Sequence, residues 1–286
     1  MTLAELRKVC IDILSENGFS DPPFEFRLIA RHVTGRKRED MSPLDEICDD
    51  DAAQIIRMCS SRRDGYPLQY MLGTWPFMDL ELYVGEGVLI PRQDTEAVVE
   101  TAVRHIRGMA RPLVMDLCSG TGAIALAIRE MCPNATVMAL EKEDEAYSYL
   151  TRNIEKTGLA VLPVHRDVFR YDDAPEDSTF DVIISNPPYI DEKLEGTLQK
   201  ELSWEPRSAL YTTGGGLRFF RYIAAYYKRT LKDGGLLIFE FGSDQADEVE
   251  AILRREGYDI VERIRDASGN DRGTVARNRS RPGKIL

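Results

Sequence analysis

The sequence has few of the residues that build metal sites and disulfide frameworks. Its 286 residues include three histidines and five cysteines, no two cysteines have C-x-x-C spacing, and no H-E-x-x-H occurs. We therefore expect no dedicated metal site, and reduced thiols as in a cytoplasmic protein. No apolar run approaches the ~20 residues of a membrane span. Met1 to Arg7 lacks the basic-then-apolar pattern of a secretory signal, so we expect no membrane partner.

Basic residues are also in deficit. Lys and Arg number 37 against 48 Asp and Glu, which gives a formal net charge of −11 and a pI near 5.0. Proteins that bind extended nucleic acid through its phosphates are normally basic, so this class of partner is disfavoured. The apolar fraction is 43% and the mean hydropathy is −0.32, an ordinary mix for a globular protein with a sizeable core.

The N-terminal quarter of the chain is predicted to be helical. Leu3, Leu6, Cys10 and Leu14 recur at helical spacing, and further amphipathic stretches follow. We expect a small helical domain over 1–73. Apolar residues alternate over 78–84, and a second apolar run covers 88–90, so a β-hairpin linker is predicted over 74–93.

Residues 94–286 form the last predicted domain. A long helix is expected after Asp94, and then strand-like apolar runs alternate with helical stretches. The runs cover 113–116, 136–140, 161–164, 180–185 and 236–239. This alternation predicts an α/β fold with a mostly parallel sheet and helices on both faces. Ligands of such sheets bind at the carboxyl ends of the strands, where the chain has its motifs.

The first run ends at Asp116 and leads into a glycine-containing turn, Cys118-Ser119-Gly120-Thr121-Gly122, which opens a helix. Gly120 and Gly122 allow a ligand to approach the backbone closely, and the helix N-terminus offers free N–H groups. The turn matches neither G-x-G-x-x-G nor a P-loop. A carboxylate at Asp116 repels pyrophosphate and suits an ammonium group. A purely structural turn is the alternative interpretation.

Acidic residues follow the next two runs. Glu141 lies 19 residues after Gly122, where an acid can accept both hydroxyls of a ribose; a surface acid in the charged run 141–145 is the alternative. Asp167 could accept a hydrogen bond from an adenine amino group, with Val168 against the ring. An ordinary loop acid is the alternative there.

The run over 180–185 leads into Asn186-Pro187-Pro188-Tyr189. The two prolines stiffen the backbone and remove two donors, so the loop presents carbonyl groups and the Asn186 side chain as acceptors. This suits a planar –NH2 group, with one N–H bound to the Asn186 oxygen and the other to the Pro187 carbonyl. A plain Pro-Pro turn is the alternative.

Asn-Pro-Pro-Tyr is typical of S-adenosylmethionine-dependent methyltransferases that act on the amino nitrogens of adenine and glutamine. Several further segments resemble the release factor glutamine N5-methyltransferase (HemK/PrmC) family. They are Pro67 to Gly73, Gly87 to Glu96, Glu205 to Leu210, Gly234 to Leu237 and Ser268 to Arg272. Because these segments are well separated and in the family's order, the chain is identified as similar to that family from about residue 60 to 277.

The resemblance implies a seven-stranded Rossmann-like methyltransferase domain after a small helical domain that recognises the substrate. It implies S-adenosylmethionine as cofactor and, as substrate, the glutamine of the Gly-Gly-Gln loop in peptide chain release factors. Carried over by position, the cofactor residues are Asp116, Cys118, Ser119, Gly120, Thr121, Gly122, Glu141, Asp167, Val168 and Asn186. The amide-binding residues are Asn186, Pro187, Pro188 and Tyr189, with Arg92 and Glu205 as candidates for the substrate rim.

The sequence departs from the family's pattern at four positions. Cys118 replaces a glycine, and because cysteine tolerates positive φ poorly we expect a turn of different shape. Gln93 replaces a proline, Glu141 an aspartate, and Val168 a frequent aromatic residue, which predicts weaker packing on adenine.

Two other functions remain open. An adenine-N6 DNA or RNA methyltransferase uses the same loop chemistry on a flipped base, although the acidic composition opposes it. A non-catalytic binding module that keeps the fold is the other alternative, which the intact Asn-Pro-Pro-Tyr loop disfavours.

Overall fold

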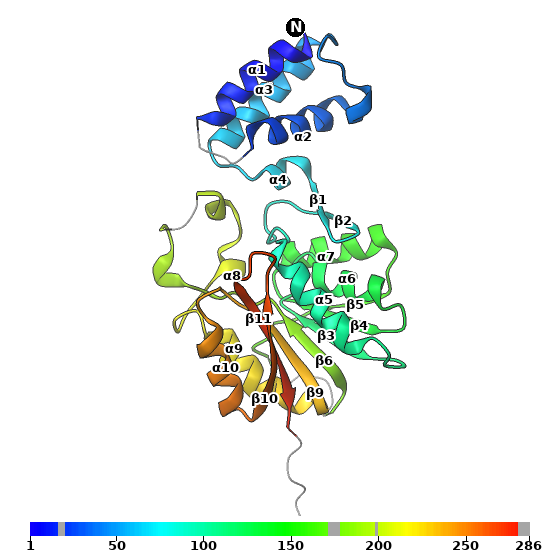
Figure 1. Cartoon of the computed structure of the whole chain (residues 1–286), viewed down its shortest axis with the longest axis vertical. Coiled ribbons are helices and arrows are strands. Elements are labelled where there is room, and N and C mark those ends of the chain that lie inside the picture. The colour runs from blue at the N-terminus through cyan, green and yellow to red at the C-terminus, as the bar shows by residue number, and fades with distance from the viewer. Residues whose placement is uncertain (17–20, 171–177, 198–199, 280–286) are drawn as a thin grey trace, which may run out of the picture. The chain divides into compact units, whose positions relative to one another are not determined.

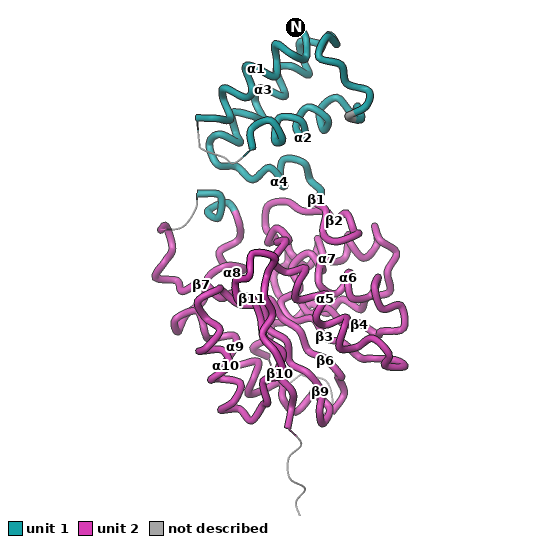
Figure 2. Tube along the Cα trace, in the orientation of Figure 1, with its two compact units in different colours: residues 1–74, 199–204 teal, residues 75–198, 205–286 magenta. Residues whose placement is uncertain are grey.

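The computed structural model describes residues 1–16, 21–170, 178–197 and 200–279 (Figure 1). The chain divides into two compact units, residues 1–74 with 199–204 and residues 75–198 with 205–286, which Figure 2 draws in teal and magenta. Each unit has hydrophobic core residues of its own.

The first unit is helical. Its elements are α1 (Leu3–Ser15), α2 (Pro22–Thr34), η1 (Arg38–Asp40), α3 (Asp49–Arg63), α4 (Leu68–Leu72) and η4 (Lys200–Trp204). Helix α1 begins with a capping box, because the Thr2 hydroxyl accepts from the Glu5 N–H and the Glu5 carboxylate accepts from the Thr2 N–H. Leu6, Cys10 and Leu14 are fully buried, as their helical spacing predicts.

The described part of the second unit contains a seven-stranded sheet in the order β10-β11-β9-β6-β3-β4-β5. Its strands are β3 (Leu113–Leu117), β4 (Thr136–Glu141), β5 (Val161–His165), β6 (Phe180–Ser185), β9 (Leu231–Glu240), β10 (Tyr258–Arg265) and β11 (Asp271–Asn278). β3, β4, β5, β6 and β9 are parallel, which confirms the predicted parallel sheet. β10 and β11 add an antiparallel hairpin beside β9.

Helices cover both faces of this sheet (Figure 1). The main helices are α5 (Asp94–Ile106), α6 (Ala123–Met131), α7 (Asp144–Thr157), α9 (Arg218–Tyr226) and α10 (Ala246–Arg255). Alternate residues of β6 face opposite layers: Val182 and Ile184 pack in the core with α5, α6 and α7, and Ile183 packs with α9 and α10. The described residues of this unit also form short elements, among them β7 (Ile190–Asp191), η3 (Glu192–Leu194), α8 (Arg207–Leu210), β8 (Tyr211–Thr212) and η5 (Tyr227–Thr230).

The segment 74–93 contains a β-hairpin, but its strands differ from those expected. β1 (Thr74–Phe77) pairs with β2 (Leu80–Tyr83), and Met78 in the turn between them has φ 50°. The expectation that 88–90 supplies the second strand was wrong. The Ile90 N–H instead donates to the Glu205 carboxylate at 3.0 Å, so this segment is held as a loop by a side chain rather than by a strand.

The beginning of α5 is tied to the C-terminal hairpin. Arg272 in β11 places its Nε 3.1 Å from Asp94 Oδ2 and 2.9 Å from Asp266 Oδ2. Two carboxylates from distant parts of the chain therefore share one guanidinium group.

Candidate active site

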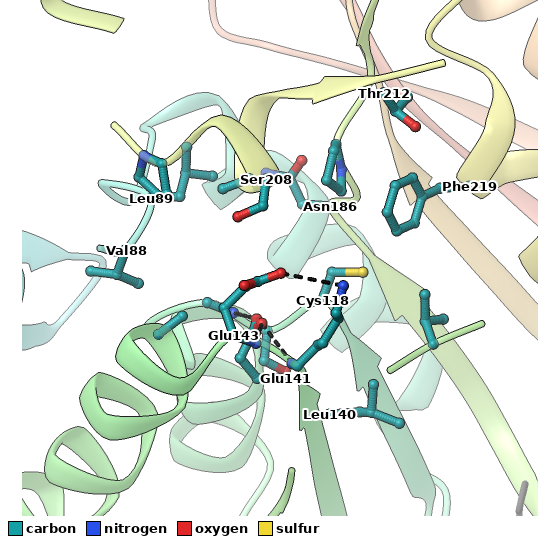
Figure 3. A pocket seen from close by; sticks show the side chains of 18 of the residues that line it. Val88, Leu89, Cys118, Leu140, Glu141, Glu143, Asn186, Ser208, Thr212 and Phe219 are labelled. Atoms are coloured by element: carbon teal, nitrogen blue, oxygen red, sulfur yellow. Dashed lines mark hydrogen bonds and ion pairs between the residues drawn. The ribbon is translucent and has the colours of Figure 1, made fainter. Parts of the chain in front are cut away.

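A cavity of about 470 Å³ lies at the carboxyl ends of the parallel strands of the second unit. The predicted site residues that line it are Arg92, Cys118, Ser119, Gly120, Thr121, Glu141, Asp167, Val168, Asn186 and Pro188. Figure 3 shows Asn186 and Phe219 on one side of this space and Glu141 with Glu143 on the other. Residues that are far apart in sequence are brought together because each one follows a strand of the same sheet.

The turn after β3 is held by its own hydrogen bonds. Ser119 Oγ donates to Asp116 Oδ2 at 2.8 Å, and the Gly122 N–H donates to the Ser119 carbonyl at 2.8 Å. Gly122 has φ 83°, and a Cβ there would lie 2.6 Å from Leu150 Cδ1. The structure thus requires Gly122 for packing against α7, and Gly122 is not among the described residues that line the cavity.

Cys118 has φ 61°, in the left-handed region that glycine occupies without strain. Cys118 therefore adopts the backbone conformation that a glycine would have here. The different turn shape that we expected from a cysteine is not found in the φ angle of Cys118. Its side chain is half-buried and lines the cavity.

Replacing Cys118 by glycine should relieve this conformation. A left-handed non-glycine residue costs roughly 1–2 kcal/mol. We expect Cys118→Gly to unfold about 2–4 °C above Cys118→Ala, which removes the same side chain but keeps a Cβ. Thermal unfolding followed by circular dichroism compares the two variants. Equal midpoints would show that the turn imposes no strain on the cysteine.

Glu141 ends β4 with its carboxylate bound to the backbone. Oε2 accepts from the Gly120 N–H at 2.8 Å, and Oε1 accepts from the N–H groups of Lys142 and Glu143 at 2.7 and 2.9 Å. The side chain is buried and lines the cavity, so it is not the solvated surface acid of the alternative interpretation. It joins the glycine turn of β3 to the end of β4.

Asp167 and Val168 lie on the same rim of the cavity. Asp167 Oδ1 accepts from the Phe169 N–H at 2.9 Å, and its Oδ2 lies 3.6 Å from Lys142 Nζ. Val168 is 3% exposed. Asp167 therefore shapes its own loop and lines the cavity, and its contact with an adenine amino group stays a prediction.

Asn186 has a fixed orientation. Its Nδ2 donates to Glu240 Oε1 at 2.8 Å and approaches Thr95 Oγ1 at 3.4 Å. Glu240 ends β9, which is the parallel neighbour of β6. Because the –NH2 group of Asn186 is engaged by the protein, its carbonyl oxygen is the part left to accept from a ligand.

Two other members of the loop, Pro187 and Tyr189, are not among the described residues that line the cavity. The Tyr189 carbonyl accepts from Gln245 Nε2 at 2.9 Å, and its ring packs against the core that contains α9 and α10. Burial raises the pKa of the Tyr189 hydroxyl. Its predicted contact with the target amide stays a prediction.

Arg92 and Glu205 form an ion pair. Glu205 is buried and also holds the Ile90 N–H, whereas Arg92 lines the cavity. The pair therefore fixes the loop that precedes α5, and contact of Arg92 with a substrate stays a prediction.

Asp116 is fully buried and is not among the described residues that line the cavity. Its Oδ1 has no hydrogen-bond partner in the part of the chain that the structure describes. Burial raises its pKa to about 7, against the hydrogen bond from Ser119, which lowers it. Direct contact of Asp116 with a ligand's ammonium group stays a prediction.

Asp116 and Glu240 should make folding stability depend on pH. Burial also raises the pKa of Glu240 to about 7. Both folded-state values lie above the ~4 of an unfolded carboxyl group, so the folded chain binds more protons between pH 4 and 7. Stability should thus rise as pH falls from 8 to 6, by about 1 kcal/mol for each group. Urea unfolding at several pH values measures this, and the double variant D116N/E240Q should remove the slope.

Sequence reasoning missed Glu240, Thr95 and Phe219. Thr95 and Phe219 line the cavity, and Glu240 lies behind Asn186. The sequence does contain a signal for Glu240. Glu240 directly follows the apolar run 236–239, just as Glu141 directly follows the apolar run 136–140. Its partnership with Asn186 depends on β9 pairing with β6, which the sequence alone does not specify.

Two protein-family models match the chain. The methyltransferase small domain matches residues 95–238, and the PrmC N-terminal domain matches residues 5–73. Within the described residues, no helix is both long and apolar enough to span a membrane.

Curated relatives cover nearly the whole chain. The release factor glutamine methyltransferase of Bordetella pertussis is 35% identical over 91% of this chain and 96% of its own length. That of Escherichia coli is 33% identical over 90% of this chain and 92% of its own length. These matches do not favour the adenine-methylating alternative. The chain belongs to the release factor glutamine methyltransferase family.

Proposed function

We propose that this protein transfers a methyl group from S-adenosylmethionine to the side-chain N5 of the Gly-Gly-Gln glutamine in peptide chain release factors. The observation that carries the proposal is the Asn186 carboxamide, held by Glu240 so that its oxygen can accept from a planar –NH2 group. Membership of the family supports the same substrate.

The cavity fits the cofactor. Its volume lies within the ~300–1,000 Å³ typical of small-molecule sites. A carboxylate has about four acceptor positions, and Glu141 uses three of them on backbone N–H groups. This leaves one for a ribose hydroxyl, rather than the two hydroxyls expected from the sequence. A Cβ added to Gly120 would meet only Val88, at 3.9 Å, so this backbone is open to a ligand.

The protein's own part in the reaction is to hold the amide. S-adenosylmethionine, when bound, supplies an electrophilic methyl group on sulfur. Asn186 Oδ1 accepts one N–H of the target amide and the Pro187 carbonyl accepts the other. These two bonds concentrate electron density on the nitrogen and fix its direction of attack. Pro188, which lines the cavity, helps to exclude water.

The proposal also assigns a separate role to each of three segments of the chain. Residues 1–73 recognise the substrate, 74–93 link the parts, and 94–286 bind the cofactor and catalyse transfer. The match of residues 5–73 to the PrmC N-terminal domain supports the first assignment. The net charge of −11 supports a protein substrate rather than nucleic acid. Free buried thiols such as Cys10 and Cys59 support a cytoplasmic location.

A direct assay tests the proposal. The protein is incubated with radiolabelled S-adenosylmethionine and either a release factor or DNA and RNA. We expect label in the release factor alone, and mass spectrometry should find one added methyl group on the glutamine of its Gly-Gly-Gln motif. Label in nucleic acid would instead support the adenine-N6 alternative.

A further inference from the structure

Glu240 is an ionisable residue that is almost completely buried. It ends β9, is 2% exposed, and is not among the described residues that line the cavity. Its Oε1 accepts from Asn186 Nδ2 at 2.8 Å, while its Oε2 has no hydrogen-bond partner among the residues that the structure describes. Burying a carboxylate with an unused oxygen costs folding stability, so packing alone does not explain a glutamate here.

The register of the sheet places this carboxylate behind the amide-binding loop. Ser185 at the end of β6 pairs with Phe239 of β9, so the next residues along the two strands, Asn186 and Glu240, are neighbours. An ionised carboxylate has only acceptors, whereas a carboxamide has a donor end and an acceptor end. The Asn186 –NH2 group must therefore face Glu240, and its oxygen must face away.

We propose that Glu240 is a positioning residue that orients and polarises the Asn186 carboxamide toward the glutamine amide of the substrate. The inference rests on the proposed function. A hydrogen bond from Nδ2 to a carboxylate is charge-assisted, and it shifts electron density within the carboxamide toward Oδ1. Oδ1 then accepts more strongly from the N–H of the target amide. Glu240 does not touch the substrate and exchanges no proton with it.

Charged and titratable groups on several elements act on Glu240. Asp94 on α5 disfavours its ionisation, and Arg272 on β11 and Arg92 before α5 favour it. The Thr95 hydroxyl, which accepts from Asn186 Nδ2 at 3.4 Å, also lowers the pKa of Glu240, and Tyr189 lies close enough to feel the charge of Glu240. Burial is the largest influence and raises the pKa of Glu240 to about 7, so the carboxylate is lost when pH falls below neutrality.

Glu240→Gln is the test variant, because it removes the charge and keeps the shape. A glutamine side chain can both donate and accept, so Asn186 loses its orientation as well as its polarisation. Losing a charge-assisted hydrogen bond corresponds to about a 10- to 100-fold fall in kcat. We expect that fall with an unchanged affinity for S-adenosylmethionine by calorimetry and little change in KM for release factor.

The pH profile separates this role from simple packing. Wild-type kcat should fall below pH ~7, as Glu240 becomes protonated, and Glu240→Gln should lack this acid limb. Asp116 has a similar pKa, so the pH profile of Asp116→Asn shows whether that group, rather than Glu240, causes the acid limb. An acid limb that persists in Glu240→Gln and disappears in Asp116→Asn would overturn the proposal, as would wild-type kcat in Glu240→Gln.

A second measurement does not depend on activity. The chain has six asparagines, so selective ¹⁵N labelling gives few side-chain signals, and Asn186→Ala identifies the signal of Asn186. We expect its –NH2 protons to move upfield as pH falls through 7 in the wild type. A signal that does not titrate would overturn the inference even if Glu240→Gln failed to fold. If the wild type methylated no release factor while this signal titrated, the proposed function would fail and the contact between Glu240 and Asn186 would remain.

Discussion

Asn186→Ala should lower kcat by about 10²–10³-fold, the range seen when one preorganised hydrogen-bonding group is removed from an active site. The variant loses the acceptor that holds the target amide, and it leaves the Glu240 carboxylate without the donor that it has at 2.8 Å. Affinity for S-adenosylmethionine should stay close to wild type, because Glu141 and the turn after β3 are unchanged. Single-turnover methylation of release factor measures the first effect, and calorimetry the second.

Asn134→Ala is the matched control for that experiment. Asn134 is exposed, and its side chain donates to the carbonyl groups of Met109 and Ala110, away from the cavity. Its loss should leave kcat unchanged. Near wild-type turnover in Asn186→Ala would refute the proposed role of the amide-binding loop.

Glu141→Ala should weaken cofactor binding and folding together. The substitution removes the acceptor of three backbone N–H groups, those of Gly120, Lys142 and Glu143. Each N–H group left without a partner in a buried place costs about 1–3 kcal/mol. The turn after β3 then loses its attachment to β4, and we expect the Kd for S-adenosylmethionine to rise at least ~10-fold.

Calorimetric titration with S-adenosylmethionine measures this change, and urea unfolding measures the accompanying loss of stability. Glu155→Ala on the exposed face of α7 is the matched control, since it removes a glutamate that does not line the cavity. An unchanged affinity in Glu141→Ala would rule out contact of this carboxylate with the ribose.

The sequence predicted the parallel core well because its strands are buried on both faces. Strands such as β3 and β6 are nearly continuous apolar runs, and the polar residue that ends each run marks the edge where ligands bind. From this pattern we predicted that Glu141 and Asn186 lie at the same ligand-binding edge, and both line the cavity. The pattern did not identify β10 as a strand, because that strand alternates buried and exposed residues and contains Glu262 and Arg263.

The partners of the site residues were harder to predict than the residues themselves. Arg92 and Glu205 are separated by more than a hundred positions, and their ion pair depends on the folded loop. The contact of Glu240 with Asn186 requires the register of two strands that are distant in sequence. Local patterns carry no information on such pairs, because they form only when the sheet is assembled.

The order of the sheet has a consequence for synthesis on the ribosome. Of the strands in the described residues, β11 is made last, yet it lies between β10 and β9 and brings Arg272 to Asp94 at the beginning of α5. A nascent chain that ends before Arg272 therefore exposes the edge of β9 and lacks the cation that favours ionised Glu240. The enzyme can gain its full chemistry only after Arg272 has been translated and β11 has paired with β9.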